Sequence, residues 1–535
     1  MEILIKNGLI VDGTGKQPYI GDVLIAGDCI KAIGTKLESH KARIIDATGK
    51  LVIPGLIDPH LHEEWICLVD GTYEMFLRQG VTTTVNGNCG HSIAPGPTSR
   101  IIEYYYGNGL MSERQREAYL KSFPHWDDFE SYAKAVEQKG TNINLCTLMG
   151  HGTLRWSIMG SAHDRPPTPE EEMEMIRILE HNLEQGAFGI SYGLDYVPGR
   201  YATTEELAVF AKPVSKAGGV AAAHLRHRLG VKEATEEFLE VGKQTGVRLQ
   251  ISHLKVNCPE AYTSVLKYAK DVGGVLVDTI PATTAHCQSK ERALLFMMST
   301  NDELFDKGLE GIKKAIKTPE GRALLRHDPY FIDSDQSKNT LWKTGDPTMD
   351  GKSIEELAAA IGQDPKEYLL DLFVSEKDFI LWCGGTGRRD FSMEMHGEEI
   401  MNNPYVCAGG DEILGDPEFP FDWYELLRRG AMPNFIKGNI RKGMPLEEVI
   451  RRNTSMVADH FNIVDRGRLA AGKFADLAVI DLDRFEFDSE ENVTPLNPNA
   501  MARGVELVLV NGKPALENGS VCSAMSGRVL RRGKA

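Results

Sequence analysis

The chain has 535 residues, of which 42% are hydrophobic, and its formal net charge is -16. This length is sufficient for a large core and for more than one structural unit. The acidic balance argues against a nucleic-acid partner, which would require a basic face. No run approaches the roughly 18 apolar residues of a membrane span, and the first six residues lack a signal-peptide pattern. The nine cysteines include no CxxC pair, which favours a reducing cytoplasm over a disulfide framework.

The two ends of the chain have the pattern of short β-strands. Near the N-terminus, apolar runs are separated by glycine-rich turns such as Asp12-Gly13-Thr14-Gly15. Near the C-terminus, Val505–Val510 is strand-like and is followed by the hairpin signal Asn511-Gly512. Because chain termini often lie close together, we predict that residues 1–53 and 465–535 form one small β-sandwich domain.

Residues 54–464 alternate short apolar strands with amphipathic helices, an alternation that is typical of βα units and a parallel sheet. Eight such strands predict a TIM-type (β/α)8 barrel. The strand candidates end in Asp58–His62, Val81–Asn88, Ile143–Gly150, Phe188–Tyr192, Val220–His224, Leu249–His253, Val275–Ile280 and Tyr405–Asp411. Residues 284–376 are too long for a barrel loop. We expect an inserted, lid-like segment there, and an ordinary surface subdomain is the alternative.

Side chains that bind metal ions stand at the ends of several predicted strands, where a TIM barrel has its active site. His60 and His62 are two residues apart, so both face the same side of a strand. Cys89 follows an apolar run and sits among small polar residues, which suits a thiolate ligand. With His224 and His253 it forms a set of three ligands that leaves one position for water, as a catalytic zinc requires.

Asp411 follows Gly409-Gly410 at the end of the last predicted strand. A carboxylate at this position can take a proton from an activated water and pass it to a leaving nitrogen. His151, in a Gly-His-Gly loop, could orient or polarise the substrate, or it could be a structural loop residue. Taken singly, each candidate also has a structural interpretation, such as a buried thiol or a turn aspartate. Together they predict a metal-dependent hydrolase of C–N bonds.

Longer segments around these residues resemble the amidohydrolase superfamily and, within it, the N-acyl-D-amino-acid deacylases (D-aminoacylases). The matching segments span nearly the whole chain and are Gly80–Gly90, Gly150–Arg155, Gly186–Arg200, His224–Arg226, Ser252–Lys255 and Gly467–Leu477. The resemblance implies a barrel with a small β-domain built from both termini and an inserted segment over the active site. It also implies zinc-dependent deacylation of an N-acyl-D-amino acid or a related N-acyl compound.

The resemblance further implies a role for each matching residue. Cys89, His224 and His253 would hold one tightly bound zinc. His60 and His62 would line a second, weaker metal position. Asp411 would be the catalytic acid and base and would also belong to the metal site. Cys89 would bridge the metals, because no lysine stands where related branches place a bridging lysine. The residues expected to bind the substrate's carboxylate are Tyr196, Lys255 and Arg292.

Two departures from the family pattern lie in the region that recognises the substrate. Ile280-Pro281-Ala282 replaces the usual Tyr-Pro-Tyr, and no His-Pro-Arg follows Asp411. These departures keep open a cyclic amidase (hydantoinase-like or dihydroorotase-like) or a deaminase of the same superfamily. A non-catalytic barrel scaffold is a third hypothesis, although such a protein should have lost ligands that this chain retains. We expect a small-molecule substrate, and the oligomeric state stays open, with a homo-oligomer among the options.

Overall fold

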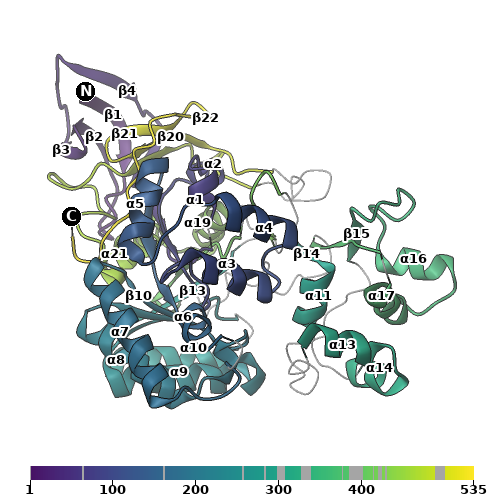
Figure 1. Ribbon diagram of the computed structural model, residues 1–535. Helices are drawn as coiled ribbons and strands as arrows, with labels where there is room; N and C mark the ends of the chain where they lie inside the picture. The colour runs from purple at the N-terminus through teal and green to yellow at the C-terminus, as the bar shows by residue number, and fades with distance from the viewer. Residues whose placement is uncertain are drawn as a thin grey trace.

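The computed structural model (Figure 1) describes most of the chain and shows a barrel, a β-domain and a separate group of helices. The described residues are 2–534 without 63–64, 161–162, 256–257, 282–284, 298–307, 327–338, 376, 385–401, 414, 420–424, 428–429 and 488–499.

Both ends of the chain contribute strands to one nine-stranded sheet. Its order is β22-β21-β20-β19-β5-β1-β2-β3, with β4 paired to β1. The strands are β1 (Glu2–Ile10), β2 (Tyr19–Ala26), β3 (Cys29–Gly34), β4 (Ala42–Asp46), β5 (Leu51–Pro54), β19 (Leu477–Ile480), β20 (Val505–Val510), β21 (Lys513–Glu517) and β22 (Ser520–Val521). The antiparallel pair of β5 and β19 joins the two halves. Apolar side chains from both halves then share one core. Both termini lie on the same side of the molecule in Figure 1.

The predicted (β/α)8 barrel is confirmed. Within the described ranges, its strands are β6 (Leu56–Asp58), β7 (Val81–Asn86), β8 (Asn144–Thr147) continued by β9 (Met149–Gly150), β10 (Gly189–Gly193), β11 (Val220–His224), β12 (Arg248–Ile251), β13 (Val275–Thr279) and β17 (Val406–Ala408). Neighbouring strands pair in parallel throughout. A parallel bridge between Leu61 and Glu412 closes the ring between the first and last strands.

Asn453 reinforces this closure from the loop after helix α20 (Leu446–Arg452). Its side-chain amide donates to the carbonyl of Ala408 at 2.8 Å and to that of Ile57 at 3.4 Å. Its side-chain oxygen accepts from the backbone N–H of Ala408 at 3.0 Å. The side chain is fully buried, so these bonds satisfy polar groups that water cannot reach.

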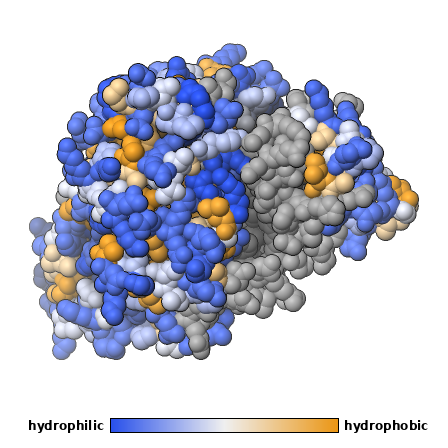
Figure 2. Space-filling view, turned by 90° about the horizontal axis from the view of Figure 1, so that it is seen from below, coloured by the Kyte–Doolittle hydropathy of each residue, from blue (hydrophilic) through white to orange (hydrophobic). Residues whose placement is uncertain are grey.

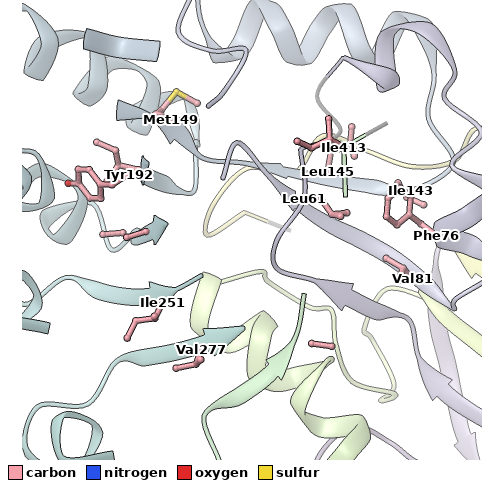
Figure 3. Close-up of a cluster of buried hydrophobic side chains, with 14 of the residues drawn as sticks. Leu61, Phe76, Val81, Ile143, Leu145, Met149, Tyr192, Ile251, Val277 and Ile413 are labelled. Carbon is pink, nitrogen blue, oxygen red and sulfur yellow. The ribbon is translucent and has the colours of Figure 1, made fainter. Parts of the chain in front are cut away.

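The alternation of side chains along each strand separates two hydrophobic layers. Figure 3 shows Met149, Tyr192, Ile251 and Val277, which belong to the large core packed between the strands and the surrounding helices. The intervening positions belong to a different cluster that fills the barrel interior, which includes Val220 and Ala222 of β11. Every second residue of a strand faces the same way, so a polar residue's position along its strand decides whether it reaches the barrel interior.

Amphipathic helices cover the outside of the barrel. They include α3 (Thr98–Gly107), α4 (Glu113–Ser122), α5 (Phe129–Lys139), α6 (His151–Met159), α7 (Pro169–Gln185), α8 (Thr204–Lys216), α9 (Val231–Thr245), α10 (Pro259–Asp271), α19 (Ala431–Arg441) and α21 (Ser455–Phe461). Helix α7 shows how local sequence sets the bounds. Thr168 and Glu171 form a capping box around Pro169, and Gly186 ends the helix with a φ of 114°, a conformation that glycine adopts without strain.

The inserted segment forms a subdomain with its own hydrophobic core. Its helices α11 (Lys290–Met297), α13 (Gly308–Ile316), α14 (Pro319–Arg326), α16 (Ile354–Ala360) and α17 (Pro365–Val374) lie to the right of the barrel in Figure 1. A four-stranded sheet links β14 (Ala285–Ser289), β15 (Thr340–Trp342), β16 (Ile380–Gly384) and β18 (Glu425–Leu427). The subdomain sheet therefore extends beyond residue 376, and the predicted boundaries at 53, 465 and 284–376 stay predictions.

Two further observations concern the whole molecule. No helix in the described part of the chain is long and apolar enough to cross a membrane. The eight cysteines that the structure describes are free thiols. On the face shown in Figure 2, the coloured hydrophobic residues form small separate groups among polar ones, which is normal for a protein surface.

Candidate metal centre

The candidate ligands reach one place because of their positions along the barrel strands. In β11, Val220 and Ala222 belong to the interior cluster, while Ala221 and Ala223 pack on the helix side. His224 follows in the interior register at the C-terminal end of the strand. The C-terminal ends of parallel strands meet at one mouth of a barrel, so residues from distant parts of the sequence meet there.

Cys89, His224 and His253 form the first group of ligand atoms. The Cys89 Sγ lies 3.5 Å from the Nε2 of His253, and that Nε2 lies 3.0 Å from the Nδ1 of His224. One ligand atom from each residue lies within 4.8 Å of the others, a spacing that could hold a metal ion. The three-residue set predicted from the sequence is therefore assembled.

His60, His62, Cys89 and Asp411 form a second group, with one ligand atom of each within 4.8 Å of the others. The Nε2 of His60 lies 3.3 Å from the Cys89 Sγ and 3.3 Å from the Oδ1 of Asp411. The Nε2 of His62 lies 3.2 Å from the same Oδ1. Cys89 belongs to both groups, so its sulfur lies where it could bridge two metal positions.

Three of these residues adopt the left-handed backbone region, which non-glycine residues rarely occupy. The φ angles are 53° for Cys89, 36° for His253 and 45° for Asp411. Such conformations are costly and cluster at functional sites, where the surrounding structure maintains them. At Asp411, a 2.7 Å hydrogen bond from its backbone N–H to the carbonyl of His60 helps to hold the conformation.

The buried groups perturb one another's protonation. Burial by itself would raise the pKa of Cys89, but the charge of His60 and hydrogen bonds from His224 and His253 hold that pKa well below its ordinary value. Burial would lower the pKa of His62, yet hydrogen bonds with Asp411 and Cys89 raise it to about 9. These contacts therefore favour the thiolate of Cys89, the form that binds metal ions.

Two aspartates that the sequence prediction missed contact the ligand histidines. Asp278, at the end of β13, places its Oδ1 3.0 Å from the Nδ1 of His60. Asp195, in the loop after β10, places its Oδ2 3.3 Å from the Nε2 of His224. Asp278 carried a signal that could have been found, because it is a polar residue in the interior register of an apolar strand. Asp195 lies in a loop and carried no such signal.

Comparison with known proteins agrees with this geometry. The model of the Amidohydrolase family matches residues 43–263 and 343–515. The chain belongs to the amidohydrolase family. A D-aminoacylase and an N-acyl-D-glutamate deacylase from Alcaligenes xylosoxydans xylosoxydans are each 28% identical to it, over 99% of this chain and 98% and 97% of theirs. A solved N-acyl-D-glutamate deacylase from Bordetella bronchiseptica, complexed with zinc and a phosphonate inhibitor, is 26% identical over 99% of both chains, with a TM-score of 0.71.

The three residues expected to bind substrate lie around the ligand groups of this amidohydrolase. The Tyr196 hydroxyl is 3.2 Å from the Nδ1 of His224. The guanidinium carbon of Arg292 lies 5.9 Å from the centre of the Tyr196 ring. The pKa of His227 is lowered to about 4, chiefly by burial and also by the charges of His224 and Lys255. Lys255 therefore lies near His227. Of the segment that departs from the family pattern, Ala282 lies outside the described residues.

His151, for which two roles were left open, is the first residue of helix α6. Its Nε2 lies 3.0 Å from the carboxylate of Glu206 on helix α8. Its ring packs against Tyr192, which faces the outer core, and against Phe210. In the described part of the chain, no hydrogen bond or ring contact joins His151 to the ligand groups. Burial lowers its pKa and favours the neutral ring. These contacts tie the start of α6 to α8 and favour the structural alternative for His151, and its catalytic role stays a prediction.

Proposed function

We propose that the protein is a zinc-dependent deacylase that hydrolyses the linear amide bond of N-acyl-D-amino acids. The observation that carries the proposal is the group of Cys89, His224 and His253 beside the carboxylate of Asp411. The full-length similarity to deacylases of N-acyl-D-amino acids supports the substrate class. Family membership establishes a hydrolase; the metal and the substrate are the proposed parts.

The donor atoms fit zinc. Zinc–nitrogen bonds of about 2.0–2.1 Å and zinc–sulfur bonds of about 2.3 Å place tetrahedral ligands roughly 3.3–3.6 Å apart. The separations of 3.5 Å and 3.0 Å within the first group are close to this range. One thiolate and two imidazoles also form a donor set that zinc favours, with the fourth position left for water. We assign the tightly bound zinc to this group and a second, weaker metal position to the group that contains His60 and His62.

When bound, zinc supplies a Lewis acid that lowers the pKa of a water and polarises a carbonyl oxygen. Asp411 supplies the proton transfers. Its carboxylate accepts a proton from the attacking water while the water oxygen bonds to the amide carbon. It then gives that proton to the nitrogen as the C–N bond breaks, so a free carboxylic acid and a free amine result. One carboxylate serves both steps because the same proton is taken and returned.

The carboxylate of the substrate requires a cationic partner, and the site has two candidates. Lys255 lies near His227, and Arg292 lies near Tyr196. We propose that these two cations, with the Tyr196 hydroxyl, orient the substrate so that its amide carbonyl faces the metal. Charge-assisted contacts of this type are stronger than neutral hydrogen bonds and fix geometry as well as affinity.

The test is a substrate panel with purified, zinc-loaded protein. The panel contains matched pairs of N-acetyl-D- and N-acetyl-L-amino acids together with cyclic ureides such as hydantoins, and amine release or ring opening is measured. The proposal expects hydrolysis of N-acetyl-D-amino acids above the L-enantiomers and the cyclic compounds. Hydrolysis of cyclic substrates alone would replace the deacylase with a cyclic amidase, and no hydrolysis with full zinc occupancy would point to a scaffold.

A further inference from the structure

Behind His224, away from the metal-facing side of the ring, lies a carboxylate that belongs to neither ligand set described above. Asp195 Oδ2 is 3.3 Å from the Nε2 of His224. The other nitrogen of the same ring, Nδ1, lies 3.0 Å from the Nε2 of His253 and 3.2 Å from the Tyr196 hydroxyl. One imidazole therefore contacts a carboxylate on one edge and the ligand group on the other.

Asp195 is itself held in place by the turn that follows β11. Its Oδ2 accepts a hydrogen bond from the backbone N–H of His227 at 3.2 Å, and the Nδ1 of His227 is also 3.2 Å away. The guanidinium of Arg228 lies 3.9 Å from the Oδ1. Side chains of Asp195, His224 and His227 are 12–18% exposed, so little water competes for these contacts. The carboxylate is thus aimed at His224 by several independent contacts.

We propose that Asp195 is a positioning residue that fixes the tautomer and ring plane of His224, and that His227 in turn holds Asp195. An ionised carboxylate can only accept a hydrogen bond, so the Nε2 of His224 must carry the hydrogen. In the neutral ring the lone pair then lies on Nδ1, which faces Cys89 and His253. The inference rests on the proposed assignment of Cys89, His224 and His253 as the zinc ligands.

His60 also has a carboxylate behind its ring, but the roles of its two ring nitrogens are exchanged relative to His224. Its Nδ1 contacts Asp278 and its Nε2 faces Cys89. The backbone N–H of His253 and the side-chain amide of Gln250 also donate to Asp278, at 2.8 Å and 2.7 Å. A carboxylate or carbonyl behind a ligating histidine commonly fixes its tautomer and raises its basicity. The arrangement at Asp195 therefore has an internal counterpart across the same centre.

An alternative for this cluster is a further metal position, since Asp195, His224 and His227 each offer an atom within 4.8 Å of the others. His224 would then have to ligate through both nitrogens and lose both ring hydrogens. A neutral imidazole donates from one nitrogen and accepts at the other, so the positioning role needs no such double deprotonation. The two assignments differ in metal stoichiometry, which can be measured.

The test compares zinc binding by the full-length protein and by two Asp195 variants, Asp195→Asn and Asp195→Ala. Asp128→Asn is the matched control, because Asp128 contacts His181 at a similar 3.2 Å on the protein surface and asparagine also caps helices well. Zinc affinity is measured by competition with a chromophoric chelator. Loss of such a partner typically weakens metal affinity about 10–100-fold. We expect that loss for Asp195→Ala, a smaller one for Asp195→Asn, and none for the control.

A spectroscopic readout separates positioning from a general loss of structure. Cobalt(II) replaces zinc, and its visible absorption bands report the geometry of the thiolate and imidazole ligands. The proposal expects shifted bands for both Asp195 variants and unchanged bands for Asp128→Asn. If Asp195→Ala does not fold, the zinc affinity and cobalt spectrum of Asp195→Asn, compared with those of Asp128→Asn, test the positioning role.

Two results would overturn the proposal. One is zinc affinity within about twofold of the unaltered protein, together with an unchanged cobalt spectrum, in the Asp195 variants. The other is the loss of exactly one bound metal per chain while the zinc at Cys89, His224 and His253 keeps its normal affinity and the cobalt spectrum of that group is unchanged, which would make Asp195 a ligand of a separate metal. All measurements use the metal alone, so their failure leaves the proposed deacylase activity standing, and an inactive substrate panel leaves the role of Asp195 standing.

Discussion

Replacement of Asp411 by asparagine tests the proton transfers with little change in structure. The side chain is 5% exposed, and asparagine has nearly the same size and the same backbone hydrogen bond to His60. The first ligand group contains no atom of Asp411, so zinc should remain bound there. Asparagine cannot take a proton from water, and both transfers depend on this one carboxylate. General acid–base catalysis contributes about 10²–10⁴-fold, so we expect the upper end, a loss in kcat of about 10⁴, or about 5.5 kcal/mol.

The assay measures kcat for the best substrate of the panel together with metal content by mass spectrometry. Asp416→Asn is the control. Asp416 lies five residues further along the chain, is also buried, and accepts a 2.8 Å hydrogen bond from the Tyr119 hydroxyl that asparagine can equally accept. The control should keep normal turnover. A variant Asp411→Asn that keeps its full zinc content and a kcat within about tenfold of the unaltered enzyme would refute the role of Asp411 in proton transfer.

Three further predictions concern residues outside the chemistry. His151→Gln should leave kcat within about twofold of the unaltered protein. It should lower the free energy of unfolding by roughly 1–3 kcal/mol, because it disturbs a buried contact with Glu206. A large fall in kcat at normal stability would instead support a catalytic role for His151. Asn453→Ala should lower stability by roughly 2–4 kcal/mol through the loss of the buried bonds that close the barrel, and an unchanged denaturation midpoint would contradict that role. Burial and the charge of Arg248 lower the pKa of His460 to about 3 in the folded protein. Below pH 6.5 the imidazole is therefore protonated in the unfolded chain while it stays neutral in the folded protein. The free energy of unfolding is therefore lower at pH 5 than at pH 7, by about 2 kcal/mol, because protonation of this ring favours the unfolded chain. The unfolding midpoint of His460→Gln should shift less between these pH values than that of the unaltered protein, and equal shifts would exclude the effect.

The barrel could be predicted from the sequence, and most residues of the candidate metal centre could be proposed from it, because their signals are local. Apolar runs separated by helical patterns mark the strands, and a polar residue at the end of such a run lies at the barrel mouth. The spacing of His60 and His62 puts both rings on one side of a strand. The position of Cys89, after an apolar strand and among small residues, indicated a thiolate ligand, and the resemblance added the role of a bridge between two metals.

His151 shows where a local signal leaves two interpretations open. Its Gly-His-Gly context resembles an active-site loop, yet the first turn of α6 carries the ring toward Glu206 and the outer core. The direction of a side chain at a strand-to-helix junction depends on how the helix packs, and the packing partner Phe210 is distant in the sequence. A motif can therefore mark the correct loop while the ring itself points elsewhere.

The sequence by itself determined the barrel, the β-domain shared by both termini, and the identity of the candidate ligands. Only the tertiary structure decided which nitrogens of His60 and His224 face the centre, and which carboxylate lies behind each ring. His60 and Asp278 are 218 residues apart, and His224 and Asp195 are 29 apart. Their contacts depend on the register between separate strands and on the course of a loop, and no spacing within one segment encodes either. Strand periodicity is a property of one segment, whereas the orientation of a ligand ring is a property of several segments packed together.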